Sequence, residues 1–348
     1  MLDPLLAFNG NVSYCLGGGC AGLLADAPPD TAAASRPSGT SEFPPGPAGL
    51  AGEVGLIQRG LYKAGYLLQQ GKPYVGYVFA RLARPSDPHA TLEVRLENEV
   101  GAAGGGAAAV LASTGPLAVT NTSWTKFDFE LTPSATTACG RDGTVFDAPI
   151  DCETSNSDLT GACVRCGGRL VVAVATPSHQ RRTHAGAGGA RPPGADAAAG
   201  VLVDQVFLSP GRWGTLATAD GRQLLIKPEP VAWVQRMGTK LLRYGGTFSK
   251  GMSLAWANYR GPPWLRPPID GHLTKLHRWS RGFGYFEVME LCEAINVTCV
   301  LSFPLGQTPA EMADFITYAY GNASTALGAL RARDGRVAPY KPIWIQMG

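Results

Sequence analysis

The hydrophobic pattern of this chain changes once, near residue 210, and this change constrains the fold more than any other feature. Before it, apolar and charged residues alternate in Leu92–Glu97 and in Phe127–Leu131, which predicts half-buried strands. More continuously apolar strands are predicted at Tyr74–Leu82, Leu170–Ala175 and Val201–Leu208. Because no strong helix pattern interrupts them, residues 53–210 are predicted to form an antiparallel, jelly-roll-like β-sandwich.

Beyond residue 210 the pattern becomes strand, helix, strand, helix, strand. A helix is predicted to end within Pro230–Gly238, and a second is predicted over Gly284–Asn296. The predicted strands are Lys240–Tyr244, Val297–Phe303 and Tyr340–Met347. This order is typical of a parallel sheet, so residues 211–348 are predicted to form part of an α/β domain.

Two of the predicted helices are amphipathic. The apolar side of Gly284–Asn296 carries Tyr285, Val288, Met289, Cys292 and Ile295, and its other side carries Glu287, Glu290 and Glu293. The three glutamates are most simply a solvent-exposed face. The other helix begins with a capping box formed by Thr308 and Glu311, and its apolar stripe contains Met312, Phe315, Ile316 and Ala319.

Three segments have compositions that do not favour packed structure. Residues 1–52 contain few large apolar groups and are predicted to be poorly ordered, because they bury too little surface to offset the entropy lost on ordering. Residues 101–109 and 178–200 are rich in Gly and Ala and are predicted to be loop insertions in the sandwich.

Charge and hydropathy exclude some classes of partner. The 30 basic and 27 acidic residues leave a net charge of +3, which argues against a nucleic-acid binder. No apolar run reaches the roughly 18 residues of a membrane span. The first residues lack the cationic start of a secretory signal peptide.

Cysteines and glycosylation motifs nevertheless favour an extracellular protein. The chain has eight cysteines, and sequons mark candidate glycosylation sites at Asn11, Asn121, Asn296 and Asn322. Cys163 and Cys166 have the spacing of a metal-ligand pair, but no second pair follows. A disulfide or free thiols are therefore favoured over zinc, and no metal or organic cofactor is implied.

Candidate binding residues follow from the predicted parallel sheet, whose active sites lie at the carboxyl ends of strands. These ends supply the candidate substrate-binding residues Tyr244, Gly245, Gly246, Phe303 and Gly348. The glycine pair would let backbone approach a ligand, although a plain tight turn is the simpler explanation. No Gly-x-Ser-x-Gly or P-loop pattern is present.

Several segments resemble, in order and spacing, the α-L-arabinofuranosidases of glycoside hydrolase family 51. Leu242–Thr247 resembles the family's Leu-Arg-aromatic-Gly-Gly strand end, and Gly282–Glu293 is similar to its Gly-Leu-Gly-Tyr-Phe-Glu helix. Residues 308–321 and 331–340 resemble the approach to its fourth barrel strand, and Ile343–Gly348 resembles that strand. Gly60–Tyr74, Trp124 and Val203–Pro210 are similar to the carbohydrate-binding-module-like sandwich of its plant-type members.

The resemblance implies a β-sandwich followed by part of a (β/α)8 TIM barrel. It implies a retaining exo-glycosidase that removes terminal α-L-arabinofuranosyl residues from arabinan, arabinoxylan or arabinogalactan. An extracellular or cell-wall location is also implied. Retaining hydrolysis requires two carboxyl groups about 5 Å apart.

In the family, the acid/base glutamate follows a Gly-Asn pair at the end of the fourth strand, and this sequence stops at Gly348. The nucleophile lies further on in the family, so no catalytic residue is named and the 348-residue chain is expected to be inactive. Two alternatives remain open: a non-catalytic carbohydrate-binding protein, and an inactive gene-model fragment. Pro304, Leu305 and Arg281 stand where the family often has Asn or Asp, which puts sugar contacts there in doubt.

Overall fold

The computed structural model describes residues 2–3, 13–16, 54–59, 65–86, 89–99, 108–141, 164–175, 200–218, 221–245, 255–266 and 283–347. The chain divides into two compact units. Unit 1 comprises Met1–Phe8 and Val12–Gly211, and unit 2 comprises Asn9–Asn11 and Arg212–Gly348. None of the described helices is long and apolar enough to cross a membrane.

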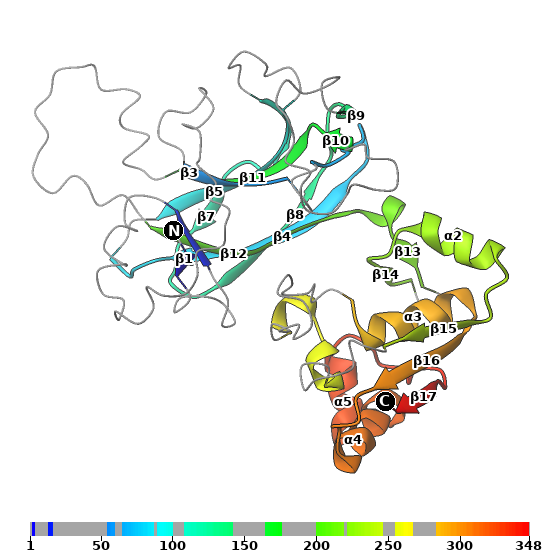
Figure 1. The fold of residues 1–348 in the computed structure, drawn as a ribbon. Coiled ribbons are helices and arrows are strands. Elements are labelled where there is room, and N and C mark those ends of the chain that lie inside the picture. Colours follow the sequence, from blue (N-terminus) through cyan, green and yellow to red (C-terminus); the bar gives the residue numbers. More distant parts are fainter. Residues whose placement is uncertain are drawn as a thin grey trace, which may run out of the picture. The chain divides into compact units, whose positions relative to one another are not determined.

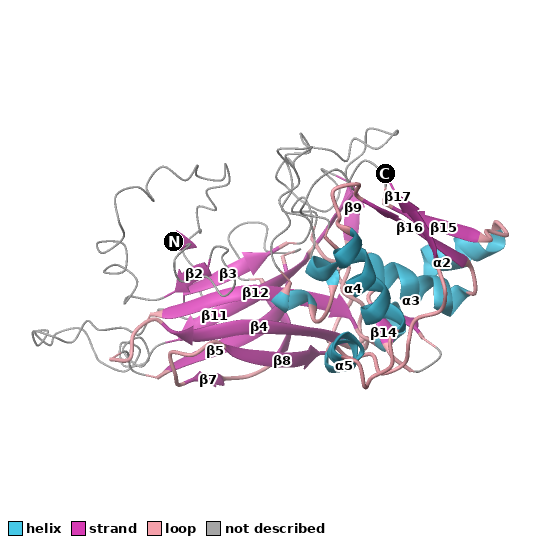
Figure 2. Ribbon diagram, turned by 90° about the horizontal axis from the view of Figure 1, so that it is seen from below, coloured by secondary structure: helices cyan, strands magenta, loops and turns pink. Residues whose placement is uncertain are grey.

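Unit 1 is built from two antiparallel sheets. One has the order β1-β2-β12-β4-β8, with β1 (Leu2–Asp3), β2 (Ser13–Leu16), β12 (Val201–Pro210), β4 (Tyr74–Leu82) and β8 (Thr125–Leu131). The other has the order β3-β11-β5-β6, with β7 also paired to β5; its strands are β3 (Val54–Gln58), β11 (Gly168–Ala175), β5 (Ala90–Asn98), β6 (Ala109–Ser113) and β7 (Leu117–Val119). The sheets lie in two layers in Figure 1, and their strands overlap when seen from below in Figure 2, which confirms the predicted sandwich.

Alternate residues of the central strands form the core of unit 1. Val78 of β4 and Leu92, Val94 and Leu96 of β5 have no exposed surface, and Val94 is in register with the equally buried Val172 of β11. Burial of each such side chain contributes about 1.5–3 kcal/mol. All five strands predicted for this unit are present. In addition, β2 lies within residues 1–52, which are predicted to be poorly ordered.

The charged face of β5 is not the solvent-exposed face that strict alternation predicts. Glu97 is buried between Arg95, at 3.2 Å, and Arg169 of β11, at 2.6 Å. Arg169 also pairs with Glu99, which in turn pairs with Arg59. Because each buried charge has a partner from a neighbouring segment, this part of β5 is covered on both faces, and the prediction of a half-buried strand is wrong here.

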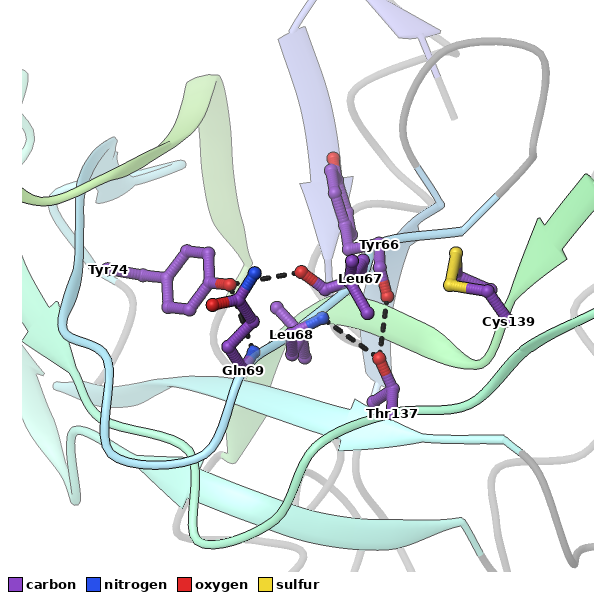
Figure 3. The surroundings of a disulfide bond; sticks show 8 residues. Tyr66, Leu67, Leu68, Gln69, Tyr74, Thr137 and Cys139 are labelled. Atoms are coloured by element: carbon purple, nitrogen blue, oxygen red, sulfur yellow. Dashed lines mark hydrogen bonds between the residues drawn. A yellow bond between two sulfur atoms is a disulfide. The ribbon is translucent and has the colours of Figure 1, made fainter. Parts of the chain in front are cut away.

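A disulfide closes one end of the described sandwich (Figure 3). Cys139 of β9 (Cys139–Arg141) is bonded to Cys166 of β10 (Val164–Cys166), and the two residues are in register in this small sheet. The Thr137 hydroxyl accepts a hydrogen bond from the amide of Leu68 and donates one to the carbonyl of Tyr66. Cys166 thus pairs with Cys139, whereas Cys163 lies outside the described residues.

Unit 2 contains a three-stranded parallel sheet with the order β15-β16-β17, as the sequence predicts. Its strands are β15 (Leu241–Tyr244), β16 (Thr298–Phe303) and β17 (Trp344–Met347). The other elements are β13 (Leu216–Ala217), β14 (Gln223–Leu224), α2 (Pro228–Arg236), α3 (Tyr285–Ile295), α4 (Pro309–Tyr320) and α5 (Ala326–Arg333), with 3-10 turns at Arg212–Gly214, Trp256–Tyr259 and Pro263–Leu265. A sheet of three strands is too small to establish a (β/α)8 barrel, so the barrel stays a prediction.

One face of this sheet packs against α3 and α4. Leu301 and Phe303 of β16 and Phe315 of α4 are fully buried in the resulting core. The Thr308 capping box forms as predicted. Ile316, however, is 42% exposed, and Tyr318 takes the core position instead, so the predicted apolar stripe is wrong at Ile316.

The glutamates of α3 are paired rather than solvated, which corrects the sequence prediction. Glu287 accepts a hydrogen bond from Arg266, Glu290 from Arg222, and Glu293 from Arg336. Glu290 is buried, and its burial raises the pKa of that carboxyl despite the neighbouring arginines. The arginines come from three separate loops, so these ion pairs attach the loops to one helix.

A second buried charge joins α4 to α5. Arg331 of α5 has no exposed surface, and its guanidinium donates to carbonyl oxygens alone among the described residues. The five acceptors are the carbonyls of Tyr318, Ala319, Gly321, Arg336 and Val337. Three of them lie at the end of α4, where helix carbonyls lack intrahelical partners. Arg331 therefore caps α4 and orders the turn after α5.

Candidate functional site at the carboxyl edge

The parallel strands of unit 2 end together and gather polar and aromatic residues. We call this region the carboxyl edge; it comprises Arg243, Tyr244, Gly245, Ser302, Phe303, Gln346 and Met347. Residues two apart on a strand share a face. Arg243, Ser302 and Gln346 therefore lie on one face, and Tyr244, Phe303 and Met347 lie on the face that packs against the helices.

A hydrogen-bonded network joins all three strands on the first face. The amide oxygen Oε1 of Gln346 accepts from Arg243 Nε at 2.7 Å and from the Ser302 hydroxyl at 3.0 Å. Ser302 is fully buried, whereas Arg243 and Gln346 are exposed. The network holds the guanidinium through Nε, and a guanidinium carries two further Nη groups, which are donors suited to a carboxylate or to sugar hydroxyls.

Tyr244 lies against an aromatic cluster on the other face. Its ring makes edge-on contacts with Phe283, at 6.0 Å between centroids, and with Tyr285, at 5.8 Å. Tyr285 in turn donates a hydrogen bond to the Ser302 carbonyl at 3.0 Å. Burial, with a smaller effect of the Glu287 charge, raises the pKa of Tyr244 above its usual value of 10.0. The phenol therefore stays neutral at physiological pH and can donate a hydrogen bond.

Gly245 lies in the left-handed region, with φ at +124°. A Cβ at this position would lie 2.5 Å from the Ser302 Cβ and 2.9 Å from the Ser302 carbonyl oxygen. Only glycine therefore allows the chain to leave β15 so close to β16. Gly246 and Gly348, also predicted to contact substrate, lie outside the described residues.

Phe303 is placed differently from the other candidates. Its side chain is fully buried between Tyr285, at 4.9 Å between ring centroids, and Phe315, at 4.8 Å. It supports the carboxyl edge from within the core. Its predicted role beside a substrate, like those of Tyr244 and Gly245, stays a prediction.

Three of the four predicted glycosylation sites lie on described, exposed turns. Asn121 and Asn322 each accept a hydrogen bond through Oδ1 from the amide two residues later, at 3.1 Å. Asn296 ends α3 in the left-handed conformation, with φ at +56°. Asn11 lies outside the described residues. Asn296 and Asn322 precede β16 and follow α4, which places both at the end of the sheet opposite the carboxyl edge.

Metal-binding chemistry has no candidate in the described part of the chain. There, no three His, Cys, Asp or Glu side chains come together as a metal ion would require. The reactive groups at the carboxyl edge are thus a guanidinium, an amide, a hydroxyl and a phenol.

Comparison with protein families identifies the segment that carries this edge. Residues 233–348 match the family model of the alpha-L-arabinofuranosidase 1 domain. Over this segment the chain is α-L-arabinofuranosidase-like. The arabinofuranosidase-like segment begins within α2 and includes every element of the parallel sheet and its helices. No curated protein matches the sequence.

Solved structures give weaker similarities. An α-L-arabinofuranosidase from Thermotoga maritima, in an arabinose complex, is 23% identical with a TM-score of 0.33, over 39% of this chain and 29% of that one. The family 51 enzyme from Thermotoga petrophila is 24% identical with a TM-score of 0.32, over 39% and 29%. The N-terminal cellulose-binding domain of a Cellulomonas fimi glucanase is 16% identical with a TM-score of 0.26, over 47% and 74%. The chain thus spans less than a third of the arabinofuranosidases it matches.

The arabinofuranosidase-like segment brings together residues that sequence reasoning did not combine. Arg243, Ser302 and Gln346 each lie at a predicted strand end, but none of them is among the predicted substrate-binding residues, and Arg243 and Gln346 are 103 positions apart. Each occupies a polar position near the end of an otherwise apolar strand. Placing the three predicted strands in parallel register would have revealed the network.

Proposed function

We propose that unit 2 supplies part of the (β/α)8 barrel of a retaining α-L-arabinofuranosidase, and that its carboxyl edge binds the sugar. One observation carries the proposal. The segment that matches the arabinofuranosidase family model contains a parallel sheet whose strand ends gather hydrogen-bonding side chains. Active sites of such folds lie at this end of the strands.

The chemistry of the described edge fits binding rather than proton transfer. Arg243, Gln346 and Tyr244 offer donors and an acceptor for sugar hydroxyls. No Asp or Glu is among the residues that define the edge. Glu287, whose charge acts on Tyr244, is held by the Gly284 amide at 2.8 Å and by Arg266. These residues would position a sugar whose hydrolysis requires two further carboxyl groups.

The substrate follows from the family match. We propose terminal α-L-arabinofuranosyl groups of arabinan, arabinoxylan or arabinogalactan, reached by an extracellular or cell-wall protein that is glycosylated at its exposed sequons. The sandwich of unit 1 would have a mainly structural role. Support for this comes from several of its aromatic residues. Tyr74, Phe79 and Phe129 are buried in the core. Of the half-buried rings, Tyr77 stacks on Phe207 and Trp124 lies beneath the Arg81 guanidinium.

Two measurements test the proposal. A protein of residues 1–348 should release no detectable 4-nitrophenol from 4-nitrophenyl α-L-arabinofuranoside. Release at even about a thousandth of the rate of a full-length relative would show that the carboxyl groups are present, since loss of general acid and nucleophile removes nearly all rate enhancement.

Binding provides the second measurement. Calorimetric titration with arabino-oligosaccharides should detect weak binding that Arg243→Ala abolishes. Arg333→Ala, which removes an exposed arginine of α5, should leave the binding unchanged. Equal effects of the two substitutions, or no binding by the unmodified chain, would contradict a sugar site at the carboxyl edge.

A further inference from the structure

Two cysteines of unit 2 lie together in its core, outside the candidate sugar site. Cys292 is near the end of α3 and Cys299 is the second residue of β16, and they are 2% and 3% exposed. Both side chains belong to the same buried cluster, each thiol shifts the pKa of the other, and neither is part of a disulfide in the structure.

The backbone between Cys292 and Cys299 forms a tight turn. Asn296 adopts the left-handed conformation, and its amide donates to the Cys292 carbonyl. The amide of Val297 donates to the same carbonyl at 3.0 Å. The chain therefore reverses tightly and returns from α3 into β16, so both side chains enter the same core.

We propose that Cys292 and Cys299 form a second intramolecular disulfide when the protein meets a small-molecule disulfide such as oxidised glutathione. The inference is independent of the proposed sugar site. Unit 1 already contains the Cys139–Cys166 disulfide, so the folded chain is compatible with an oxidising environment. The new bond would join the end of α3 to the start of β16.

The exchange balances in two steps. The Cys292 thiolate attacks one sulfur of oxidised glutathione, forming a mixed disulfide and releasing one glutathione thiolate. Cys299 then loses its proton, and its thiolate attacks the Cys292 sulfur and releases the second glutathione. Two protein thiols are oxidised, one glutathione disulfide is reduced, and the two protons pass to the released thiolates.

Electrostatics selects the order of the steps. The hydrogen bond from Cys299 lowers the pKa of Cys292, whereas the same contact and burial raise the pKa of Cys299. The lowered pKa favours Cys292 over Cys299 as the first nucleophile. Because both thiols are buried, oxidation follows local opening of the turn at Asn296 and Val297, which are exposed and half-buried respectively.

Peptide mapping tests the proposal on the full chain, made without glycosylation in a bacterial host. The protein is equilibrated at the glutathione ratio that just completes the Cys139–Cys166 disulfide, then alkylated in denaturant and cleaved after glutamate. Cleavage after Glu290, Glu293 and Glu311 separates the two cysteines into peptides 291–293 and 294–311. These peptides should remain joined, with a mass two hydrogens below their sum.

Variants and proteolysis complete the test. Cys299→Ala should abolish the joined peptide and leave Cys292 alkylated, and Cys166→Ala should leave the joined peptide intact. The oxidised chain should be cut at α3 by thermolysin at least about tenfold more slowly than the reduced chain, and the double variant Cys292→Ala/Cys299→Ala should show no such difference. Full alkylation of both cysteines, or linkage of either to another cysteine, would overturn the proposal.

Discussion

Gly245 shows how one residue controls the approach of two strands. Its φ of +124° and the 2.5 Å that would separate an added Cβ from the Ser302 Cβ exclude a side chain. We expect Gly245→Ala to lower the free energy of unfolding of unit 2 by about 2 kcal/mol, because both backbone strain and a clash oppose it. Urea unfolding, followed by hydrogen exchange of unit 2 peptides, measures this loss.

The matched control for this substitution lies in the loop after β16. At Gly306 an added Cβ would meet no atom within 4 Å. Gly306→Ala should therefore change stability by less than about 1 kcal/mol. An equal loss of unfolding free energy in the two variants would show that position 245 does not require glycine.

Removal of Arg331 should be costly. Arg331→Met deletes a fully buried guanidinium and leaves up to five carbonyls without this donor, so we expect a loss of about 3–5 kcal/mol. Arg333→Met, on the exposed side of the same helix, should cost less than about 0.5 kcal/mol. Denaturant unfolding of both variants compares them, and similar midpoints would contradict a structural role for Arg331.

At the scale of helices and strands, local pattern predicts the elements but not the partners of their polar faces. Five strands of the sandwich and the helices α3 and α4 follow from apolar periodicity and capping residues. The glutamates of α3 and the charged face of β5 do not, because their partners are distant: Arg222 is 68 positions from Glu290, and Arg169 is 72 from Glu97. Sequence pattern cannot show that a counter-charge returns to cover such a face.

In the candidate site, too, local sequence pattern predicts single residues but not their distant partners. Tyr244 and Gly245 were found because each lies at the end of a predicted strand. The Arg243–Gln346–Ser302 network was not, since it depends on the register of three strands. Polar residues near the carboxyl ends of buried strands could have predicted this network, but an analysis of local periodicity does not consider them.

Glu290 makes the stability of α3 depend on pH. Burial raises its pKa above 4.5, so the folded state keeps a proton that the unfolded state has lost. Its contribution to stability therefore falls as pH rises from about 4.5 through the folded-state pKa. Glu290→Gln cannot titrate, and the stability of the wild type relative to this variant should fall over that range. Urea unfolding between pH 4 and 7 measures the difference; parallel profiles would contradict it.

At the scale of the whole molecule, the two units differ in what stabilises them. Unit 1 has the Cys139–Cys166 disulfide, which closes a loop of 27 positions, whereas the core of unit 2 is rich in aromatic residues. We expect Cys166→Ala to lower the stability of unit 1 by about 2–4 kcal/mol. Hydrogen exchange in increasing urea should show earlier exposure of unit 1 peptides and no change in unit 2 peptides. A common shift of both would mean that the units unfold together.

The carbonyl acceptors around Arg331 have a consequence for tolerance to acid. Carboxylates that pair with arginines take up protons as pH falls, and their ion pairs are then lost. Carbonyl oxygens do not titrate in that range, and the Arg331 guanidinium stays charged although burial lowers its pKa. Acid should therefore spare the corner between α4 and α5, whose attachment through Arg331 uses only carbonyl acceptors, and this corner would persist as an acid-resistant remnant of unit 2.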